Sequence, residues 1–287
     1  MSLPVSNWCQ VPVHEFESQI SFITDEYRVL PLNEVMSRIR SGSPLPPNTA
    51  CITFDDGFRN VMTTAFPILQ HHGLPSTIFL VTSLVGTNQP PWPDQLEHAI
   101  TQSDREEFDW NGLTWPLRSL ADCASACREI RKSLKSCGNQ QRLEALEELR
   151  EALGWPRITH NSTLATMGWE EIEELADTGL VDFGAHTHTH PILARCNRRT
   201  QTEELRNSRA ILMERLGKAD LLAYPNGSRS DFNAETKQIA REEGFLGAVT
   251  TINGLNSGTT DPFELRRVGV GPRLSRPLFD LRMTGIV

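Results

Sequence analysis

The sequence of 287 residues contains no long hydrophobic run, and no window approaches the ~18 consecutive apolar residues that a transmembrane helix needs. Basic residues are also few, with 28 Lys and Arg against 36 Asp and Glu, which gives a formal net charge of −8 at pH 7. A negative charge of this size disfavours nucleic acid and anionic membrane surfaces as partners. We therefore expect no membrane span and no nucleic-acid partner.

Cysteines are too few and too irregularly spaced for a disulfide framework. The six cysteines include no CxxC pair, and a chain of this length can fold without disulfides. We interpret them as free thiols in a reducing compartment. Residues 1–10 also lack the basic region and apolar run of a signal peptide. Both features predict a cytoplasmic location, although a leader removed earlier would leave the same sequence.

What the sequence does contain is a repeated alternation of short apolar strands and amphipathic helices. Hydrophobic residues make up 38% of the chain and charged residues 22%, which suits a folded domain with a sizeable core. Strand and helix in alternation predict an α/β fold with a parallel sheet. The expected strands span residues 49–54, 76–81, 181–185, 221–224 and 246–250, and the expected helices between them span 61–72, 169–178, 202–216 and 234–243.

One stretch interrupts this alternation. Residues 88–160 are polar, contain several tryptophans and carry charged helical runs. The strand and helix pattern resumes after them, so we predict a single domain over residues 1–287 with a mostly helical insertion at about 88–160.

Two adjacent carboxylates, Asp55 and Asp56, follow the expected strand at residues 49–54. Ligand sites in α/β folds lie at such strand ends. Neighbouring anions repel each other unless a cation or a proton intervenes, so a metal site is one interpretation. Taken alone, the motif favours a simple turn, because Asp-Asp-Gly is common turn chemistry.

Three histidines lie within five residues after the strand at 181–185, namely His186, His188 and His190. Imidazole is the commonest neutral metal ligand, and histidine with carboxylate suits zinc or a similar divalent ion. The alternative is a solvated polar loop. One carboxylate and two histidines would leave positions open for water and substrate, and the second carboxylate could accept the proton of the water.

Both clusters resemble motifs of a known family. The run Thr-Phe-Asp-Asp-Gly at residues 53–57 and the run from His186 to His190, followed by proline, resemble the first two motifs of the polysaccharide deacetylases. These share the nodulation-type chitooligosaccharide deacetylase domain (carbohydrate esterase family 4). The similarity covers most of the chain outside residues 95–160. It implies a distorted (β/α) barrel and a metal-dependent hydrolase that removes N-acetyl groups from an oligo- or polysaccharide.

The resemblance also implies a role for each residue of the two motifs. Asp55 matches the catalytic base, and Asp56, His186 and His190 match the metal ligands. Zinc is the expected ion, with cobalt, nickel, manganese and iron left open. Thr187 matches a position whose hydroxyl supports the loop. His188 falls between the ligands and receives no ligand role.

A third run, at residues 223–227, resembles the groove wall of the family. Tyr224 and Pro225 are expected to contact substrate, and the backbone N–H of Asn226 is expected to stabilise the oxyanion. The run departs from the family pattern, since Ala223 stands where arginine is common and Asn226 where an aromatic residue is usual.

Two further residues are candidates with a plainer alternative. Arg267 matches an arginine near the C-terminus of the family branch that has alanine in the third motif, and it could orient Asp55; otherwise it is an ordinary surface arginine. Trp92 resembles a residue of the branch with a helical insertion and could stack on a sugar face. Its alternative role is to anchor a loop by packing.

One expected group is missing. Many members carry a C-terminal histidine that serves as general acid, but this sequence has no histidine after His190. Two alternatives stay open beside deacetylation, and the missing histidine suggests the second. One is a deacylase or deformylase acting on a lipid-linked or small amino sugar. The other is a catalytically weak carbohydrate-binding protein that retains the metal.

Overall fold

The computed structural model describes residues 11–155, 158–159, 162–272 and 274–285. Its centre is a curled sheet of six parallel strands in the order β10-β9-β8-β7-β4-β3, which confirms the predicted α/β fold with a parallel sheet. The strands are β3 (Ile52–Phe54), β4 (Ser76–Leu80), β7 (Val181–Ala185), β8 (Leu221–Ala223), β9 (Gly247–Asn253) and β10 (Leu265–Arg267).

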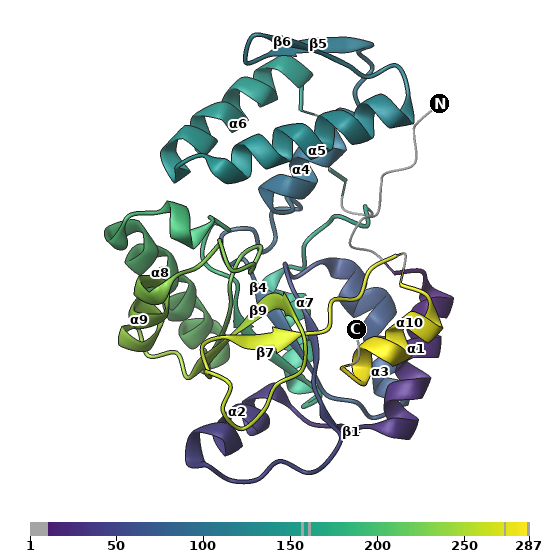
Figure 1. Cartoon of the computed structure of the whole chain (residues 1–287), viewed down its shortest axis with the longest axis vertical. Coiled ribbons are helices and arrows are strands. Elements are labelled where there is room, and N and C mark those ends of the chain that lie inside the picture. The colour runs from purple at the N-terminus through teal and green to yellow at the C-terminus, as the bar shows by residue number, and fades with distance from the viewer. Residues whose placement is uncertain (1–10, 156–157, 160–161, 273, 286–287) are drawn as a thin grey trace.

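Helices pack around this sheet. Figure 1 shows α8 and α9 on one side of the sheet, and α1, α3 and α10 on the other. The longest of these helices, α8, starts where the side chain of Asn197 accepts a hydrogen bond from the amide of Thr200, and it ends at the left-handed Gly217. The helices are α1 (Val13–Glu26), α2 (Leu32–Ser41), α3 (Phe66–His71), α7 (Trp169–Asp177), α8 (Arg198–Leu216), α9 (Ala234–Glu242) and α10 (Arg276–Met283).

The two faces of the sheet enter different hydrophobic clusters. On β4, Ile78 and Leu80 pack with residues of α7, α8 and α9, while Phe79 between them packs with Leu32 and Met36 of α2. This period of two follows from the pleat of a strand. Since β4 is buried along its whole length, the sheet is covered on both faces and its strand ends are the places left for a site.

Several boundaries differ from those predicted. The strand expected at residues 49–54 breaks at Cys51 into β2 (Thr49–Ala50), which pairs with β1 (Arg28–Val29), and β3. As an edge strand, β3 is half-buried rather than buried. The helix expected at 61–72 begins with a π-helical turn, Val61–Ala65, which precedes α3 and lies next to Pro67, a residue with no N–H for the regular helical pattern.

The insertion between β4 and α7 has a hydrophobic cluster of its own. Figure 1 shows it as a separate layer at one end of the molecule. Three of its five elements are helices, and the other two form an antiparallel hairpin, not predicted, that turns at Asn111 and Gly112, both in the left-handed region. Its elements are α4 (Trp92–Thr101), β5 (Glu107–Trp110), β6 (Leu113–Pro116), α5 (Leu120–Ser136) and α6 (Asn139–Leu153).

Two predictions about composition can be compared with this structure. The five cysteines in the described part of the chain are free thiols, as expected, while Cys9 lies outside the described residues. Every helix in the described ranges is too short or too polar to cross a membrane. The predicted cytoplasmic location stays a prediction.

Candidate metal and catalytic site

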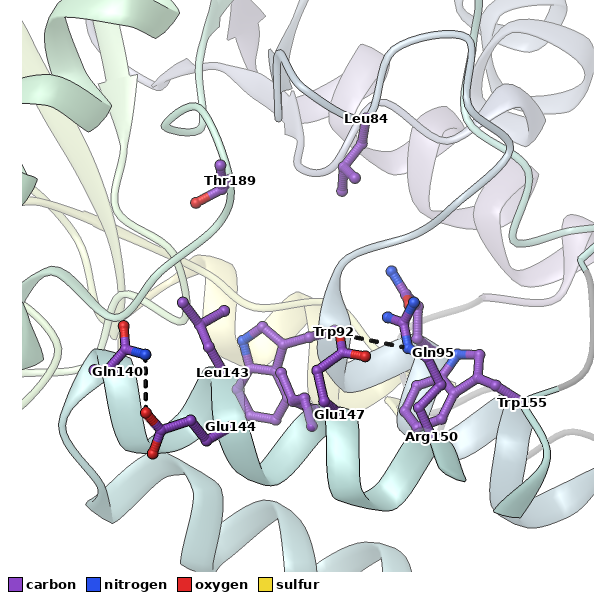
Figure 2. A pocket seen from close by; sticks show the side chains of 11 residues that line it. Leu84, Trp92, Gln95, Gln140, Leu143, Glu144, Glu147, Arg150, Trp155 and Thr189 are labelled. Atoms are coloured by element: carbon purple, nitrogen blue, oxygen red, sulfur yellow. Dashed lines mark hydrogen bonds and ion pairs between the residues drawn. The ribbon is translucent and has the colours of Figure 1, made fainter. Parts of the chain in front are cut away.

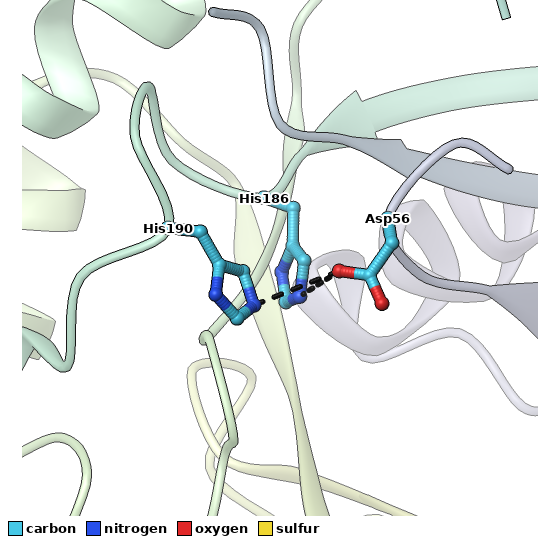
Figure 3. Close-up of side chains that lie close together, drawn as sticks. All are labelled: Asp56, His186 and His190. Atoms are coloured by element: carbon cyan, nitrogen blue, oxygen red, sulfur yellow. Dashed lines mark ion pairs between the residues drawn. The ribbon is translucent and has the colours of Figure 1, made fainter. Parts of the chain in front are cut away.

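Asp56, His186 and His190 converge where β3 and β7 end (Figure 3). The Oδ1 atom of Asp56 lies 3.5 Å from Nε2 of His186 and 3.6 Å from Nε2 of His190. Ligand atoms held about 2.1 Å from a tetrahedral ion lie roughly 3.4 Å apart. The three predicted ligands are therefore spaced to hold one divalent ion.

Hydrogen bonding sets the tautomer of His186. Its Nδ1 donates to the carbonyl oxygen of Ala223 at 2.8 Å, which leaves the lone pair of Nε2 directed toward Asp56. Burial lowers the pKa of both histidines and keeps the imidazoles neutral. Neutral imidazoles with a free lone pair are the form that binds a metal ion.

Asp56 is the electrostatically strained member of the site. Burial raises its pKa well above the ordinary value, and the negative charges of Asp94 and Asp55 raise it further, while Arg267 partly opposes them. Its Oδ1 is buried and has no hydrogen-bond partner among the described residues. A bound cation would satisfy this oxygen and stabilise the charge, so the donor set fits a divalent metal.

The ligand loops depend on unusual backbone conformations. Asp56, Thr187 and His190 all have positive φ angles between 61° and 70°, which non-glycine residues rarely adopt. Gly57 follows with φ of 71°, and a Cβ atom there would lie 2.7 Å from a methyl group of Leu80. The turn after β3 therefore needs glycine at this position, while the carboxylate of Asp56 is directed at the histidines.

Two side chains hold the histidine loop in shape. The hydroxyl of Thr187 accepts a hydrogen bond from the N–H of His190 at 3.1 Å, as the resemblance predicted. Glu204 of α8, only 8% exposed, accepts from the amides of His188 and Thr189 and from the hydroxyl of Thr189. Sequence reasoning missed Glu204, since it looks like any other acid on a charged helix.

Asp55 is held by a fork of two hydrogen bonds. Nη1 and Nη2 of Arg267 donate to its two carboxylate oxygens at 2.8 and 2.7 Å. Burial alone would raise the pKa of Asp55, but the charge and hydrogen bonds of Arg267 outweigh it and lower the pKa to about 2. Asp55 is thus ionised over the whole physiological range.

The same arginine joins the two edges of the sheet. Arg267 ends β10 at one edge, and Asp55 follows β3 at the other. Nη1 of Arg267 also donates to the hydroxyl of Thr53 at 3.2 Å, and its Nε donates to the carbonyl of Thr250 at 2.7 Å. Arg267 is therefore not an ordinary surface arginine, because its contacts link the two open edges of the half-barrel beside the candidate base.

The third motif contributes through its backbone more than through its side chains. Tyr224 is fully buried, stacks on Phe232 and donates its hydroxyl to the carbonyl of Phe263, so this side chain has no surface for the substrate contact expected of it. Pro225 is buried as well. Asn226 has a positive φ of 60°, and its buried Nδ2 has no hydrogen-bond partner among the described residues.

The start of α4 contains the candidate Trp92 and an acid, Asp94, whose charge acts on the site. Trp92 is 8% exposed and packs in the cluster of the insertion, but it also lines a cavity (Figure 2). Asp94, in the first turn of α4, is 5% exposed, and its charge raises the pKa of Asp56 more than that of Asp55 does. In the sequence, Asp94 could have been noticed as an acid that directly follows Trp92 and Pro93 at the start of a helix.

Comparison with known proteins agrees with this architecture. A relative, the poly-β-1,6-N-acetyl-D-glucosamine N-deacetylase of Escherichia coli K12, is 34% identical over 101 residues, which are 34% of this chain and 15% of that protein. The chain spans less than half the length of the curated relatives that it matches.

Two solved structures share the fold over nearly the whole chain. One is the Streptococcus pyogenes deacetylase PplD in complex with acetate (TM-score 0.63, 20% identity, 95% of this chain and 87% of that chain). The other is IcaB from Ammonifex degensii (TM-score 0.63, 21% identity, 98% of this chain and 93% of that chain). The family model described as polysaccharide deacetylase matches residues 42–248. That range exceeds half of the chain and includes both metal-site motifs, so the chain belongs to the polysaccharide deacetylase family.

Proposed function

We propose that the protein is a metal-dependent hydrolase that removes N-acetyl groups from an amino-sugar glycan. The observation that carries the proposal is the pairing of a three-ligand cluster with an ionised, arginine-held carboxylate on the next residue. A turn of Asp-Asp-Gly without a catalytic role would not need this arrangement. The E. coli relative is named for the same reaction on poly-β-1,6-N-acetyl-D-glucosamine.

Asp56, His186 and His190 would hold the ion. Zinc is our first choice, because one carboxylate and two imidazoles form a donor set that it commonly takes in hydrolases. When bound, a divalent ion polarises the acetyl carbonyl and lowers the pKa of a water molecule toward ~7.

Asp55 is assigned the proton transfers. As an anion it accepts the proton of the attacking water, and the fork of Arg267 fixes the orientation of its carboxylate. A carboxyl group with a low pKa is a weak base but releases its proton readily. Asp55 can therefore return the proton to the departing nitrogen, which addresses the absence of any histidine beyond His190.

The oxyanion of the tetrahedral centre is assigned to the backbone N–H of Asn226. This residue lies in the loop after β8, three positions beyond the carbonyl that orients His186. A Cβ atom on Gly227, which has φ of 67°, would lie 2.8 Å from the backbone nitrogen of Thr251. The loop can therefore close against β9 only with glycine after Asn226, which fixes the direction of the Asn226 peptide.

The missing histidine also favours a second candidate. A carbohydrate-binding protein that keeps its metal but has lost turnover would need Asp56, His186 and His190, but it would have no use for a base held by two hydrogen bonds. The Arg267 fork therefore ranks this candidate below the enzyme. A deacylase or deformylase acting on a lipid-linked or small amino sugar would use the same groups and is separated only by substrate.

The test is acetate release from N-acetylglucosamine oligomers and cell-wall glycans, with zinc, with cobalt and after chelation. We expect release that disappears on chelation and returns with added metal. A protein that binds one metal ion per chain but releases no acetate from any of these substrates would contradict the deacetylase. Formate or fatty-acid release from acylated amino sugars would then identify the deacylase alternative.

A further inference from the structure

A cavity of about 330 Å³ lies between the insertion and the barrel. Figure 2 shows Leu84 and Thr189, from the barrel, on one side, and side chains of α4 and α6 on the other. The volume is at the lower end of the range for small-molecule sites, about 300–1,000 Å³. The insertion therefore forms one wall of a site that the barrel alone would not have.

The lining combines aromatic rings with exposed polar groups. Trp92 and Trp155 supply two indole rings, Leu143 adds an apolar side chain that is 47% exposed, and Glu147 and Arg150 are exposed. Flat apolar surface with hydrogen-bonding groups around it suits a sugar ring, which has an apolar face and a rim of hydroxyl groups. Glu147 and Arg150 form an ion pair at 3.9 Å, and the guanidinium of Arg150 lies 5.3 Å from the ring centroid of Trp155, so these charged groups lie beside a ring that a sugar would contact.

Both tryptophans have an unused hydrogen-bond donor. The indole Nε1 atoms of Trp92 and Trp155 are buried and have no acceptor among the described residues. Buried donors usually find a partner, and a ligand hydroxyl could supply one here. The guanidinium of Arg142, which is 2% exposed, lies 5.6 Å from the ring centroid of Trp92, so this indole is held in place by packing.

One residue of the loop that carries the candidate metal ligands lines the cavity. Thr189, which lines it, immediately precedes the ligand His190 and is tied to Glu204. Ile192, two residues after His190, is fully buried in the hydrophobic cluster of the insertion. A glycan with one unit at the metal centre would therefore have a neighbouring unit within reach of the cavity.

We infer that this cavity is a subsite for a sugar unit of the glycan next to the unit that is deacetylated, with Trp92 and Trp155 as the aromatic contacts. The inference rests on the proposed function, because that function supplies the glycan. It assigns the insertion a part in selecting oligomers over single sugars.

The test compares binding of a single N-acetylglucosamine with β-1,4-linked and β-1,6-linked tetramers. Calorimetric titration of the full chain after chelation, which stops turnover, gives the Kd of each. In the wild type we expect at least one tetramer to bind more tightly than the monomer. Trp155→Ala and Leu143→Ala should each weaken tetramer binding about five- to tenfold and reduce the ratio of the monomer Kd to the tetramer Kd.

Leu120→Ala is the matched control. Leu120 is 49% exposed, lies on α5 of the same insertion and does not line the cavity. This variant should keep the wild-type ratio, and thermal melting should confirm that all three variants are folded. The inference is overturned if neither tetramer binds more tightly than the monomer, if both cavity variants keep the wild-type ratio, or if Leu120→Ala loses it equally.

Acetate release, measured separately, distinguishes this inference from the proposed function. Release whose dependence on chain length is the same in all variants would overturn the subsite alone. The expected pattern of tetramer binding without acetate release under any metal condition would overturn the deacetylase alone.

Discussion

Some hydrogen-bonded groups around the candidate site of the barrel differ from the indole donors beside the cavity of the insertion. In the barrel, Asp55, His186 and Glu204 each have named partners, and their hydrogen bonds fix one geometry. In the insertion, the indole nitrogens of Trp92 and Trp155 are buried without partners among the described residues. Hydrogen bonds hold the side chains of the candidate site in one geometry, which favours catalysis. A buried donor without a partner beside a cavity can bind a hydroxyl group of a ligand. We therefore expect substitutions in the barrel to affect turnover, and substitutions at the cavity of the insertion to affect which glycans bind.

The two adjacent carboxylates of the candidate site also differ from each other. Asp55 and Asp56 are neighbours, yet the pKa of Asp55 is lowered to about 2 and that of Asp56 is raised well above its usual value. Arg267 explains much of the difference, since of the two carboxylates it donates hydrogen bonds to Asp55. One carboxylate is thus stabilised by the protein, and the other needs an added cation.

The largest effect is expected from removal of a metal ligand. His186→Gln should lower metal affinity by at least roughly 100-fold, because even changes outside the ligand set cost 10–100-fold. Metal content after dialysis against a competing chelator measures it. His188→Gln is the matched control, since His188 lies in the same loop, contacts Thr82 and is outside the ligand group. Equal metal loss in both variants would contradict the assignment.

Next in size is the loss of the Arg267 fork. In Arg267→Gln the half-buried Asp55 loses its main stabilising charge, so its pKa should rise and its anionic fraction should fall. The acid limb of the kcat/KM profile should then move to higher pH, with activity near pH 7 reduced about 10- to 100-fold. Arg267→Lys, which keeps the charge but not the fork, should move the limb less. An unmoved limb in Arg267→Gln would argue against Asp55 as the base.

A smaller effect is expected from Glu204, which accepts hydrogen bonds from the loop of His186–His190. Glu204→Gln removes a charged acceptor of the His188 and Thr189 amides, and metal affinity should fall about tenfold. Glu203→Gln is the control, because Glu203 is the adjacent residue of α8 but pairs only with the exposed Arg199. A competition titration with a chromophoric chelator would show whether the two variants differ, and identical affinities would remove Glu204 from the account.

The smallest effect on turnover per folded molecule is expected from the core of the insertion. Leu149→Ala deletes a fully buried side chain of α6 and should lower the free energy of unfolding by about 2–5 kcal/mol. Leu143→Ala, on the exposed side of the same helix, should change it by less than about 0.5 kcal/mol. Urea denaturation measures both. A loss of turnover in folded Leu149→Ala protein as large as that in Arg267→Gln would contradict the assignment of catalysis to the barrel and of glycan selection to the insertion.

Sequence reasoning succeeded where the signal was local. The strand at Val181–Ala185 and the spacing of His186 and His190 could be read from neighbouring residues. It failed where long-range contacts decide. The burial of Tyr224 depends on Phe232 and Phe263, and the place of Arg267 depends on the curl that brings β10 near β3.

The insertion contains one feature that neighbouring residues could have predicted and one that they could not. Its hairpin was missed although Asn111 and Gly112 form a strong turn signal between alternating residues. The cavity could not be predicted, because it needs Thr189 of the barrel opposite Trp92 and Trp155 of the insertion. The spacing of residues along the chain does not show which residues of the two regions face each other in the folded protein.

The most direct test of the central claim is to measure metal content and acetate release on one preparation of the Asp55→Asn variant. Our account predicts one metal ion per chain, as in the wild type, with turnover reduced by at least about 10²-fold, because the ligands remain and the base is lost. Wild-type turnover in this variant with the metal retained would contradict the assignment of Asp55 as the base, and with it the proposed mechanism.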